Sequence, residues 1–282
     1  MHSVDKAMKL DVSSRVTMND GRKIPMFGLG TYQAPPGQKT YDAIRYALKI
    51  GYRLIDTARL YENEEIVGKA IRDSGIPREE VFVTTKLWNS DHGYDSTLAA
   101  FDRSLRRLGL DYVDLYLIHW PVPGKRMESW KALEHLQKQG RCRSIGVSNY
   151  LVRHLEELLG VSDVVPAVNQ VEFHPFLFQK SLLEYCRDKE IQLEAYSPLT
   201  KGQRLNDPGI KRIAAAYFKS PAQIMIRWGL QHEVVEIPKS TNEERISENA
   251  RIFDFEISRE DMAALDAMDE RLHTSWNPED LQ

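Results

Sequence analysis

"RLIDTARLYENEE", residues 53–65, decides the fold, because an apolar, strand-like run ends there in a charged side chain. Leu54 and Ile55 are followed by the carboxylate of Asp56, and Tyr61 comes five residues later. A single carboxylate after a strand is most often the N-cap of the next helix. Its meaning therefore depends on whether the other apolar runs of this chain end in the same way.

The composition is that of an ordinary globular protein with a large core. Of 282 residues, 42% are hydrophobic and 28% are charged, and the net charge is −3. Scattered Lys and Arg exclude a nucleic-acid surface, and no apolar run is long enough to span a membrane. Two cysteines, Cys142 and Cys186, and an N-terminus without a signal-peptide pattern predict a cytoplasmic protein. We expect it to act as a monomer.

Apolar, β-branched runs alternate with stretches of helical spacing. The runs begin near residues 26, 52, 81, 113, 143, 167, 191 and 234. Residues 96–110 and 128–140 show the helical spacing, and Gly140 is placed to end the second of these helices. The repeat of about thirty residues is the size of a βα unit, so we predict an α/β fold, a (β/α)8 TIM barrel. Residues 14–25, with an Asp-Gly turn, predict an N-terminal β-hairpin that caps the bottom of the barrel.

No Pro-rich or Ser-rich linker divides the chain, so we predict a single domain over residues 1–282. In this fold the strands end on one face, where barrel active sites are built. Seven consecutive runs place polar or titratable side chains at their ends. These residues are Asp56, Lys86, His119, Ser148, Asn149, Gln170, Tyr196, Ser197, Lys239 and Ser240.

Taken one by one, these side chains have ordinary structural explanations: a lone Lys is usually solvated, and a lone His is usually a satisfied core residue. Together they suggest acid catalysis. A buried Lys86 needs a compensating charge, which Asp56 offers. A cation beside Tyr61 is expected to lower the pKa of its phenol and make it a proton donor to a carbonyl oxygen. His119 is expected to donate a second, orienting hydrogen bond.

A metal site is the alternative for one further pair. Glu172 and His174 lie two residues apart on one strand, but the sequence offers no third ligand, so we predict no metal.

Seven segments together resemble the aldo-keto reductase family, in order and spacing, over about residues 16–270. They are "RLIDTARLYENEE" (53–65), "VFVTTKLW" (81–88), "VDLYLIHWP" (113–121), "IGVSN" (145–149), "VNQVEFHP" (168–175), "AYSPL" (195–199) and "IPKSTNEERISEN" (237–249). The resemblance is closest to the short-loop microbial and protozoan branch, which includes 2,5-diketogluconate, methylglyoxal and prostaglandin F reductases. It implies an NADPH-dependent reduction of aldehydes, ketones or dicarbonyls, with Asp56, Tyr61, Lys86 and His119 as catalytic residues.

The same resemblance implies where NADPH binds. Ser148, Asn149 and Gln170 match positions that bind the nicotinamide carboxamide, and Tyr196 matches the ring that stacks on the nicotinamide. Ser197 and Leu199 fall on the pyrophosphate loop. The positions of the 2′-phosphate and adenine sites are matched by Lys239, Ser240, Thr241, Arg245, Glu248 and Asn249. A phosphate dianion suits such cationic and hydroxyl donors.

The substrate pocket is expected to be walled by Tyr32, Trp88 and Trp120 beside His119. Many relatives have Trp where this chain has Tyr32, and Gly where it has Thr200. The short segment after His119 leaves little chain for a lid, and the C-terminal tail either folds over the mouth through Trp276 or frays. An NADPH-sensing regulatory subunit with the same barrel is the alternative function.

Overall fold

The computed structural model describes residues 10–280, and its central sheet has eight parallel strands in chain order. The first nine residues, part of the segment in which we expect no signal peptide, lie outside this range. The strands are β3 (Leu29–Gly30), β4 (Leu54–Asp56), β5 (Phe82–Leu87), β6 (Val113–Ile118), β7 (Cys142–Ser148), β8 (Val168–Glu172), β9 (Gln192–Tyr196) and β10 (Val235–Glu236). Each begins within about three residues of its predicted position, so the prediction of eight parallel strands is confirmed.

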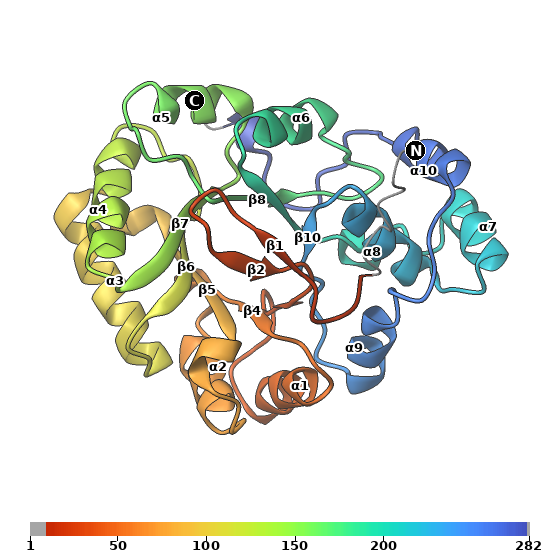
Figure 1. Cartoon of the computed structure of the whole chain (residues 1–282), viewed down its shortest axis with the longest axis horizontal. Helices are drawn as coiled ribbons and strands as arrows, with labels where there is room; N and C mark the ends of the chain where they lie inside the picture. The colour runs from red at the N-terminus through yellow and green to blue at the C-terminus, as the bar shows by residue number, and fades with distance from the viewer. Residues whose placement is uncertain (1–9, 281–282) are drawn as a thin grey trace, which may run out of the picture.

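The two ends of the sheet approach each other. The backbone N–H of Gly28 donates to the carbonyl of Glu236 over 2.9 Å, and that of Gly30 donates to Pro238 over 3.2 Å. Parallel bridges also join Phe27 to Glu236 and Gly30 to Lys239. The first strand region is therefore hydrogen-bonded to the last, and helices surround the sheet (Figure 1).

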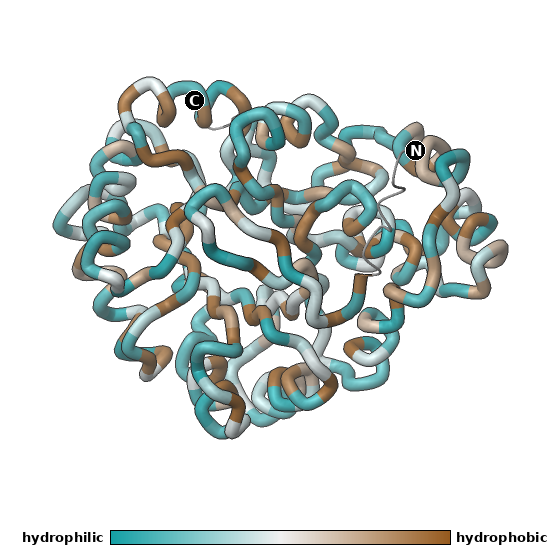
Figure 2. The backbone as a smooth tube through the Cα atoms, viewed as in Figure 1, coloured by the Kyte–Doolittle hydropathy of each residue, from teal (hydrophilic) through white to brown (hydrophobic). Residues whose placement is uncertain are grey.

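The helices follow the strands and cover the outer face of the sheet. They are α1 (Gln38–Lys49), α2 (Glu64–Arg72), α3 (Tyr94–Leu108), α4 (Arg126–Lys138), α5 (Val152–Leu159), α6 (Lys180–Asp188), α7 (Pro208–Ala216), α8 (Pro221–Gln231), α9 (Glu243–Ala250) and α10 (Arg259–Asp266). Apolar and polar residues interleave along the outer helices (Figure 2), as expected for helices with one buried face. Within residues 10–280, no helix is both long and apolar enough to cross a bilayer.

Local signals explain where several helices begin and end. The side chain of Ser220 accepts a hydrogen bond from the backbone N–H of Gln223, and the side chain of Gln223 accepts one from the backbone N–H of Ser220. The helix α8 therefore starts with a capping box. Gly109 and Gly140, with φ of 61° and 72°, follow α3 and α4 in the left-handed conformation that ends helices. Both predicted helices are thus present, and the C-terminal glycine predicted at position 140 is confirmed.

Side chains alternate between the inside and the outside of the sheet, as the two-residue period of a strand requires. On the inside, Leu54, Leu115 and Val168 belong to a small apolar cluster at the N-terminal end of the strands. Two residues further along β4 and β8, the same face carries Asp56 and Gln170. The interior is therefore apolar at one end and polar at the other, and the polar end is the C-terminal end of the strands.

An antiparallel hairpin of β1 (Arg15–Thr17) and β2 (Lys23–Pro25) lies at the apolar end. Met18 and Ile24 from the hairpin pack in the same small apolar cluster. The hydroxyl of Ser144 on β7 donates to the carboxylate of Asp20 in the turn, over 2.6 Å. Figure 1 shows the hairpin in front of the sheet, on the side away from the polar strand ends.

Candidate functional site

A single cavity of about 1290 Å³ opens at the C-terminal ends of the strands. It brings together most of the residues that the sequence predicts for the site. Those that line it are Tyr32, Asp56, Tyr61, Trp88, His119, Trp120, Asn149, Gln170, Tyr196, Ser197, Leu199, Lys239, Ser240, Thr241, Arg245, Glu248 and Asn249. Two predicted residues, Lys86 and Ser148, are fully buried behind this lining instead.

The cavity floor contains a buried ion pair. Lys86 is fully buried on β5, and its Nζ lies 2.7 Å from each carboxylate oxygen of Asp56 on β4. The same Nζ donates to the carbonyl of Thr57 over 3.0 Å. Burial raises the pKa of the Asp56 carboxyl, and the charge of Lys86 acts against that rise. The buried ammonium of Lys86 thus has the negatively charged partner that the sequence analysis expected in Asp56.

Tyr61 meets this pair from the short 3₁₀ helix η1 (Arg59–Tyr61). Its hydroxyl lies 3.3 Å from Lys86 Nζ, which donates to it. The predicted lowering of its pKa is wrong: burial, and next the nearby Asp56 carboxylate, raise the pKa of Tyr61 well above its ordinary value. The loss of solvation and the negative charge of Asp56 together outweigh the ammonium, so Tyr61 keeps its proton across the neutral range.

His119 follows β6 and faces the same point in the cavity. Its ring centroid lies 5.8 Å from that of Tyr61 and 5.3 Å from that of Trp88. Burial, and then the charge of Lys86, lower the pKa of His119 well below its ordinary value, so the ring is neutral at pH 7. A neutral imidazole carries one N–H donor and one acceptor. It is therefore suited to orient a carbonyl group but not to act as the acid.

Three hydrogen-bonded polar side chains, those of Ser148, Asn149 and Tyr196, lie beside His119. Asn149 follows β7 with a left-handed φ of 63°, a conformation that Asn tolerates and that turns its side chain inward. Its amide nitrogen donates to the carbonyl of His119 over 3.0 Å, and its amide oxygen accepts from the hydroxyl of Tyr196 over 2.8 Å. Ser148 donates to the backbone carbonyl of Gln170 over 2.8 Å. Ser148 thus supports the lining from behind.

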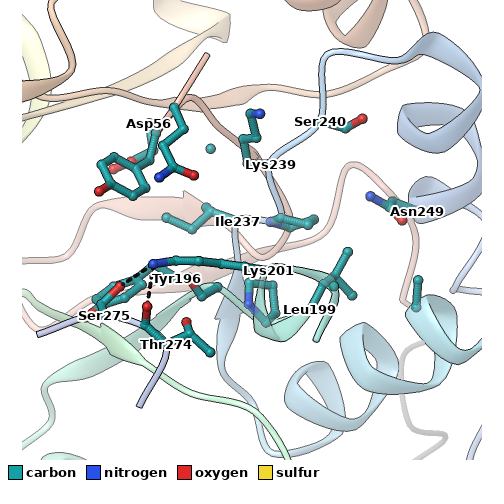
Figure 3. Close-up of a pocket in the computed structure, with 18 of the residues that line it drawn as sticks. Asp56, Tyr196, Leu199, Lys201, Ile237, Lys239, Ser240, Asn249, Thr274 and Ser275 are labelled. Atoms are coloured by element: carbon teal, nitrogen blue, oxygen red, sulfur yellow. Dashed lines mark hydrogen bonds between the residues drawn. The ribbon is translucent and has the colours of Figure 1, made fainter. Parts of the chain in front are cut away.

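The other end of the cavity is cationic. Lys239, Ser240 and Arg245 line it, together with Lys39 at the start of α1. Figure 3 shows Ser240 and Asn249 on the side of the cavity away from Asp56. Burial, and then the positive charge of Lys39, lower the pKa of Lys239. Two cations that repel each other beside a hydroxyl donor fit a phosphate group, since an anion relieves the repulsion.

The segment after β9 combines a polar loop with backbone strain. Ser197, Thr200 and Lys201 all have φ of 50° or 51°, in the left-handed region that L-residues with a side chain rarely occupy. Each such residue costs roughly 1–3 kcal/mol. Thr200 offsets part of this cost because its hydroxyl accepts from the backbone N–H of Arg204 over 3.0 Å.

The C-terminal tail folds over the mouth of the cavity. Glu172, buried at the end of β8, accepts from the backbone N–H of Thr274 over 2.9 Å, from its hydroxyl, and from the N–H of Ser275 over 3.2 Å. From the opposite side, Lys201 Nζ donates to the carbonyl of Thr274 over 2.6 Å and to the hydroxyl of Ser275 over 3.1 Å (Figure 3). We call this set the tail clasp.

The tail clasp places Trp276 in the pocket wall. The ring centroid of Trp276 lies 6.2 Å from that of Trp88 and 5.5 Å from that of Trp120. The tail therefore folds over the mouth of the cavity and does not fray. Trp276 is still 63% exposed, so the wall that it adds is open to solvent.

Several lining residues were missed in the sequence. Lys39, Lys201 and Lys211 line the cavity, but they stand on polar stretches where a lysine normally points to water. The sequence indicated Glu172 only as one half of a possible metal-binding pair with His174. In the structure His174 lies 3.3 Å from the Glu172 carboxylate, and that carboxylate holds the C-terminal tail. The spacing of the sequence carries no signal for contacts between residues 172 and 274.

The chain is similar to known enzymes over almost its whole length. It is 52% identical to the glyoxal reductase of Bacillus subtilis over 97% of this chain and 99% of the relative. It is 48% identical to the 9,11-endoperoxide prostaglandin H2 reductase of Trypanosoma cruzi, over 94% and 95%. A crystal structure of a Bombyx mori aldo-keto reductase in complex with NADP matches with a TM-score of 0.89 and 36% identity, over 96% and 97%.

The fold, the cavity and these relatives define the class of the protein. It is an oxidoreductase that reduces the carbonyl groups of small molecules with NADPH as its coenzyme. The model of the aldo/keto reductase family matches residues 26–270, and the chain belongs to that family.

Proposed function

We propose that Asp56, Tyr61, Lys86 and His119 form the catalytic centre of this reductase, with Tyr61 as the general acid. The observation that carries the proposal is the position of Lys86 Nζ, which is hydrogen-bonded both to Asp56 and to the hydroxyl of Tyr61 at the cavity floor. When bound, NADPH supplies the hydride that adds to the carbonyl carbon. The proton of the Tyr61 hydroxyl moves to the carbonyl oxygen, and Lys86 stabilises the phenolate that remains.

The remaining roles follow from the same arrangement. His119, neutral at pH 7, donates one hydrogen bond to the carbonyl oxygen and orients it. Asn149 and Gln170 hold the carboxamide of the nicotinamide, and Tyr196 stacks on its ring. Ser197 and Leu199 lie on the loop that contacts the pyrophosphate. The cationic end around Lys239, Ser240, Thr241 and Arg245 takes the 2′-phosphate, and Glu248 and Asn249 the adenine.

We propose short dicarbonyls and reactive aldehydes as the preferred substrates. Tyr32, Trp88, Trp120 and Trp276 give the pocket aromatic walls, and Tyr32 and Trp276 are 41% and 63% exposed. An open, aromatic slot accepts many shapes and holds each of them weakly. Steroids need longer loops to enclose them and are expected to bind poorly.

A screen of NADPH consumption tests this function. Short dicarbonyls, aromatic aldehydes, keto-sugars and steroid ketones are compared at matched concentrations. We expect the highest kcat/KM with the dicarbonyls and aldehydes. Tight turnover of steroids contradicts the open pocket, and no consumption with any carbonyl compound contradicts the catalytic role of the site.

Arg245→Ala is expected to weaken NADPH binding by about tenfold or more and to leave NADH binding almost unchanged. A charge-assisted hydrogen bond contributes roughly 1.5–3 kcal/mol, and only NADPH carries the phosphate that receives it. Dissociation constants from tryptophan fluorescence measure both. Arg251→Ala is the matched control, because Arg251 follows the same helix and is exposed outside the cavity lining. An equal loss for both coenzymes disproves the placement of the phosphate.

Trp276→Ala is expected to raise KM for bulky aromatic aldehydes several-fold, since an aromatic contact contributes roughly 0.5–1.5 kcal/mol. KM for a short dicarbonyl and the dissociation constant of NADPH stay near their wild-type values. Phe218→Ala, which removes a ring that is 95% exposed elsewhere, is the control. An unchanged KM across the size series removes the tail from the substrate site.

We also propose that the chain is one closed (β/α)8 barrel domain over residues 1–282, with its hairpin at the bottom. The hydrogen bonds from Gly28 to Glu236 and from Gly30 to Pro238, and the packing of Met18 in the interior, support this arrangement. We further propose a monomer in the cytoplasm. In support of the cytoplasm, Cys142 and Cys186 are both free thiols.

A further inference from the structure

A second buried acid lies under the cavity floor. Glu194 on β9 is fully buried, and its register partner on β8 is Gln170. The amide nitrogen of Gln170 donates to Glu194 over 2.8 Å and to Asp56 over 2.9 Å. The same N–H₂ group therefore joins the two buried acids.

This arrangement fixes which way the Gln170 amide points. A carboxylate only accepts hydrogen bonds, so the N–H₂ end must face Asp56. Turned the other way, the amide would place its oxygen against the Asp56 carboxylate, whereas in the observed orientation Glu194 accepts the second N–H. With both N–H donors used below the floor, the Oε1 atom of Gln170 is the end left for the cavity, which Gln170 lines.

We propose that Glu194 is a positioning residue for the coenzyme: it holds the Gln170 amide so that Oε1 accepts a hydrogen bond from the carboxamide N–H₂ of the nicotinamide. The inference rests on the proposed function and adds a residue to it. Glu194 lies behind the cavity lining and reaches the coenzyme only through Gln170.

Glu194 also faces several charged groups. Burial, followed by the charge of Asp56, raises the pKa of Glu194 to about 8, while Gln170 and Lys86 act in the opposite direction. Its other charged neighbours are Glu236 on β10 and Tyr61, and the charge of Glu194 raises the pKa of each. Glu194 is thus neutral at pH 7. Above about pH 8 it adds a second negative charge near Tyr61 and makes that phenol a weaker acid.

Two substitutions separate the hydrogen bond from the charge. Glu194→Met keeps the length of the side chain and removes the acceptor, whereas Glu194→Gln keeps an acceptor and removes the titration. Glu236→Gln is the matched control, because Glu236 is the neighbouring buried acid and makes no hydrogen bond to Gln170 within the described part of the chain. Circular dichroism and thermal melting verify that each variant is folded.

The readout is binding of two coenzymes, measured by tryptophan fluorescence. One is NADPH, and the other is its 3-acetylpyridine analogue, which has no amide N–H to donate. Glu194→Met is expected to weaken NADPH by roughly three- to tenfold and to leave the analogue nearly unchanged, as for one oriented hydrogen bond. Glu194→Gln and Glu236→Gln are expected to bind both coenzymes as the wild type does.

Equal losses for the two coenzymes, or no loss for NADPH, overturn the proposal. If Glu194→Met does not fold, Glu194→Leu takes its place in the same comparison, because Leu also removes the acceptor for the Gln170 amide. Failure of the proposed function is distinct, because the wild-type protein then neither binds NADPH nor reduces carbonyl compounds.

Discussion

Tyr61→Phe is expected to reduce kcat for carbonyl reduction by about 10²–10⁴-fold, the usual contribution of a general acid. The substitution keeps the ring and removes only the hydroxyl, which accepts from Lys86 at 3.3 Å. Single-turnover measurements at saturating NADPH give the rate of the chemical step. The dissociation constant of NADPH should stay at its wild-type value, because the aromatic wall is intact.

Tyr116→Phe is the matched control for this substitution. Tyr116 is buried on β6, and its hydroxyl makes no hydrogen bond to any other residue within 10–280. Removing that hydroxyl should leave kcat unchanged. If Tyr61→Phe keeps most of the wild-type kcat, another group donates the proton. Because the pKa of Tyr61 is raised well above its ordinary value, loss of its proton should not limit the rate near neutral pH.

Lys86→Met is expected to lower the free energy of unfolding by about 3–5 kcal/mol, since it leaves the Asp56 carboxylate buried without its partner. Urea unfolding measures the change. The loss should grow with rising pH. Without Lys86 the folded pKa of Asp56 rises further above the unfolded value, so the folded variant holds a proton that the unfolded chain has released.

Two further variants test this explanation. Asp56→Asn combined with Lys86→Met removes both charges and should recover much of the lost stability, at the expense of activity. Lys69→Met removes a lysine from an exposed pair with Asp73 and should change stability little. If the double variant is no more stable than Lys86→Met alone, the uncompensated charge is not the cause of the loss.

The sequence predicted the strands and the grouping of polar side chains at their ends because both depend on local order. Asp56, Lys86 and His119 stand at the ends of apolar runs, and parallel strands bring their ends together whatever the details of packing. The pKa of Tyr61 was predicted in the wrong direction because it depends on how much water the surrounding chain removes. That quantity has no counterpart in the spacing of residues.

Glu194 was missed for a different reason. Within "IQLEAYS", a polar residue between apolar neighbours is read as the solvent side of an alternating strand. In this sheet the same alternation points to the interior, because the outer face is covered by helices. The contacts of Lys201 with residues 274 and 275 join parts of the chain more than seventy residues apart, so no local sequence pattern predicts them.

The tail clasp limits how this protein can be redesigned or diversified. Lys201 lies in the same strained loop as Ser197 and Thr200, next to the expected path of the pyrophosphate. It also donates hydrogen bonds to the segment that carries Trp276. A tail transplanted from another reductase will therefore disturb coenzyme retention unless it presents matching groups to Glu172 and Lys201. We expect substrate range and coenzyme turnover to change together in chimeras. Glu172, Lys201 and the tail with Trp276 should therefore be exchanged as one unit.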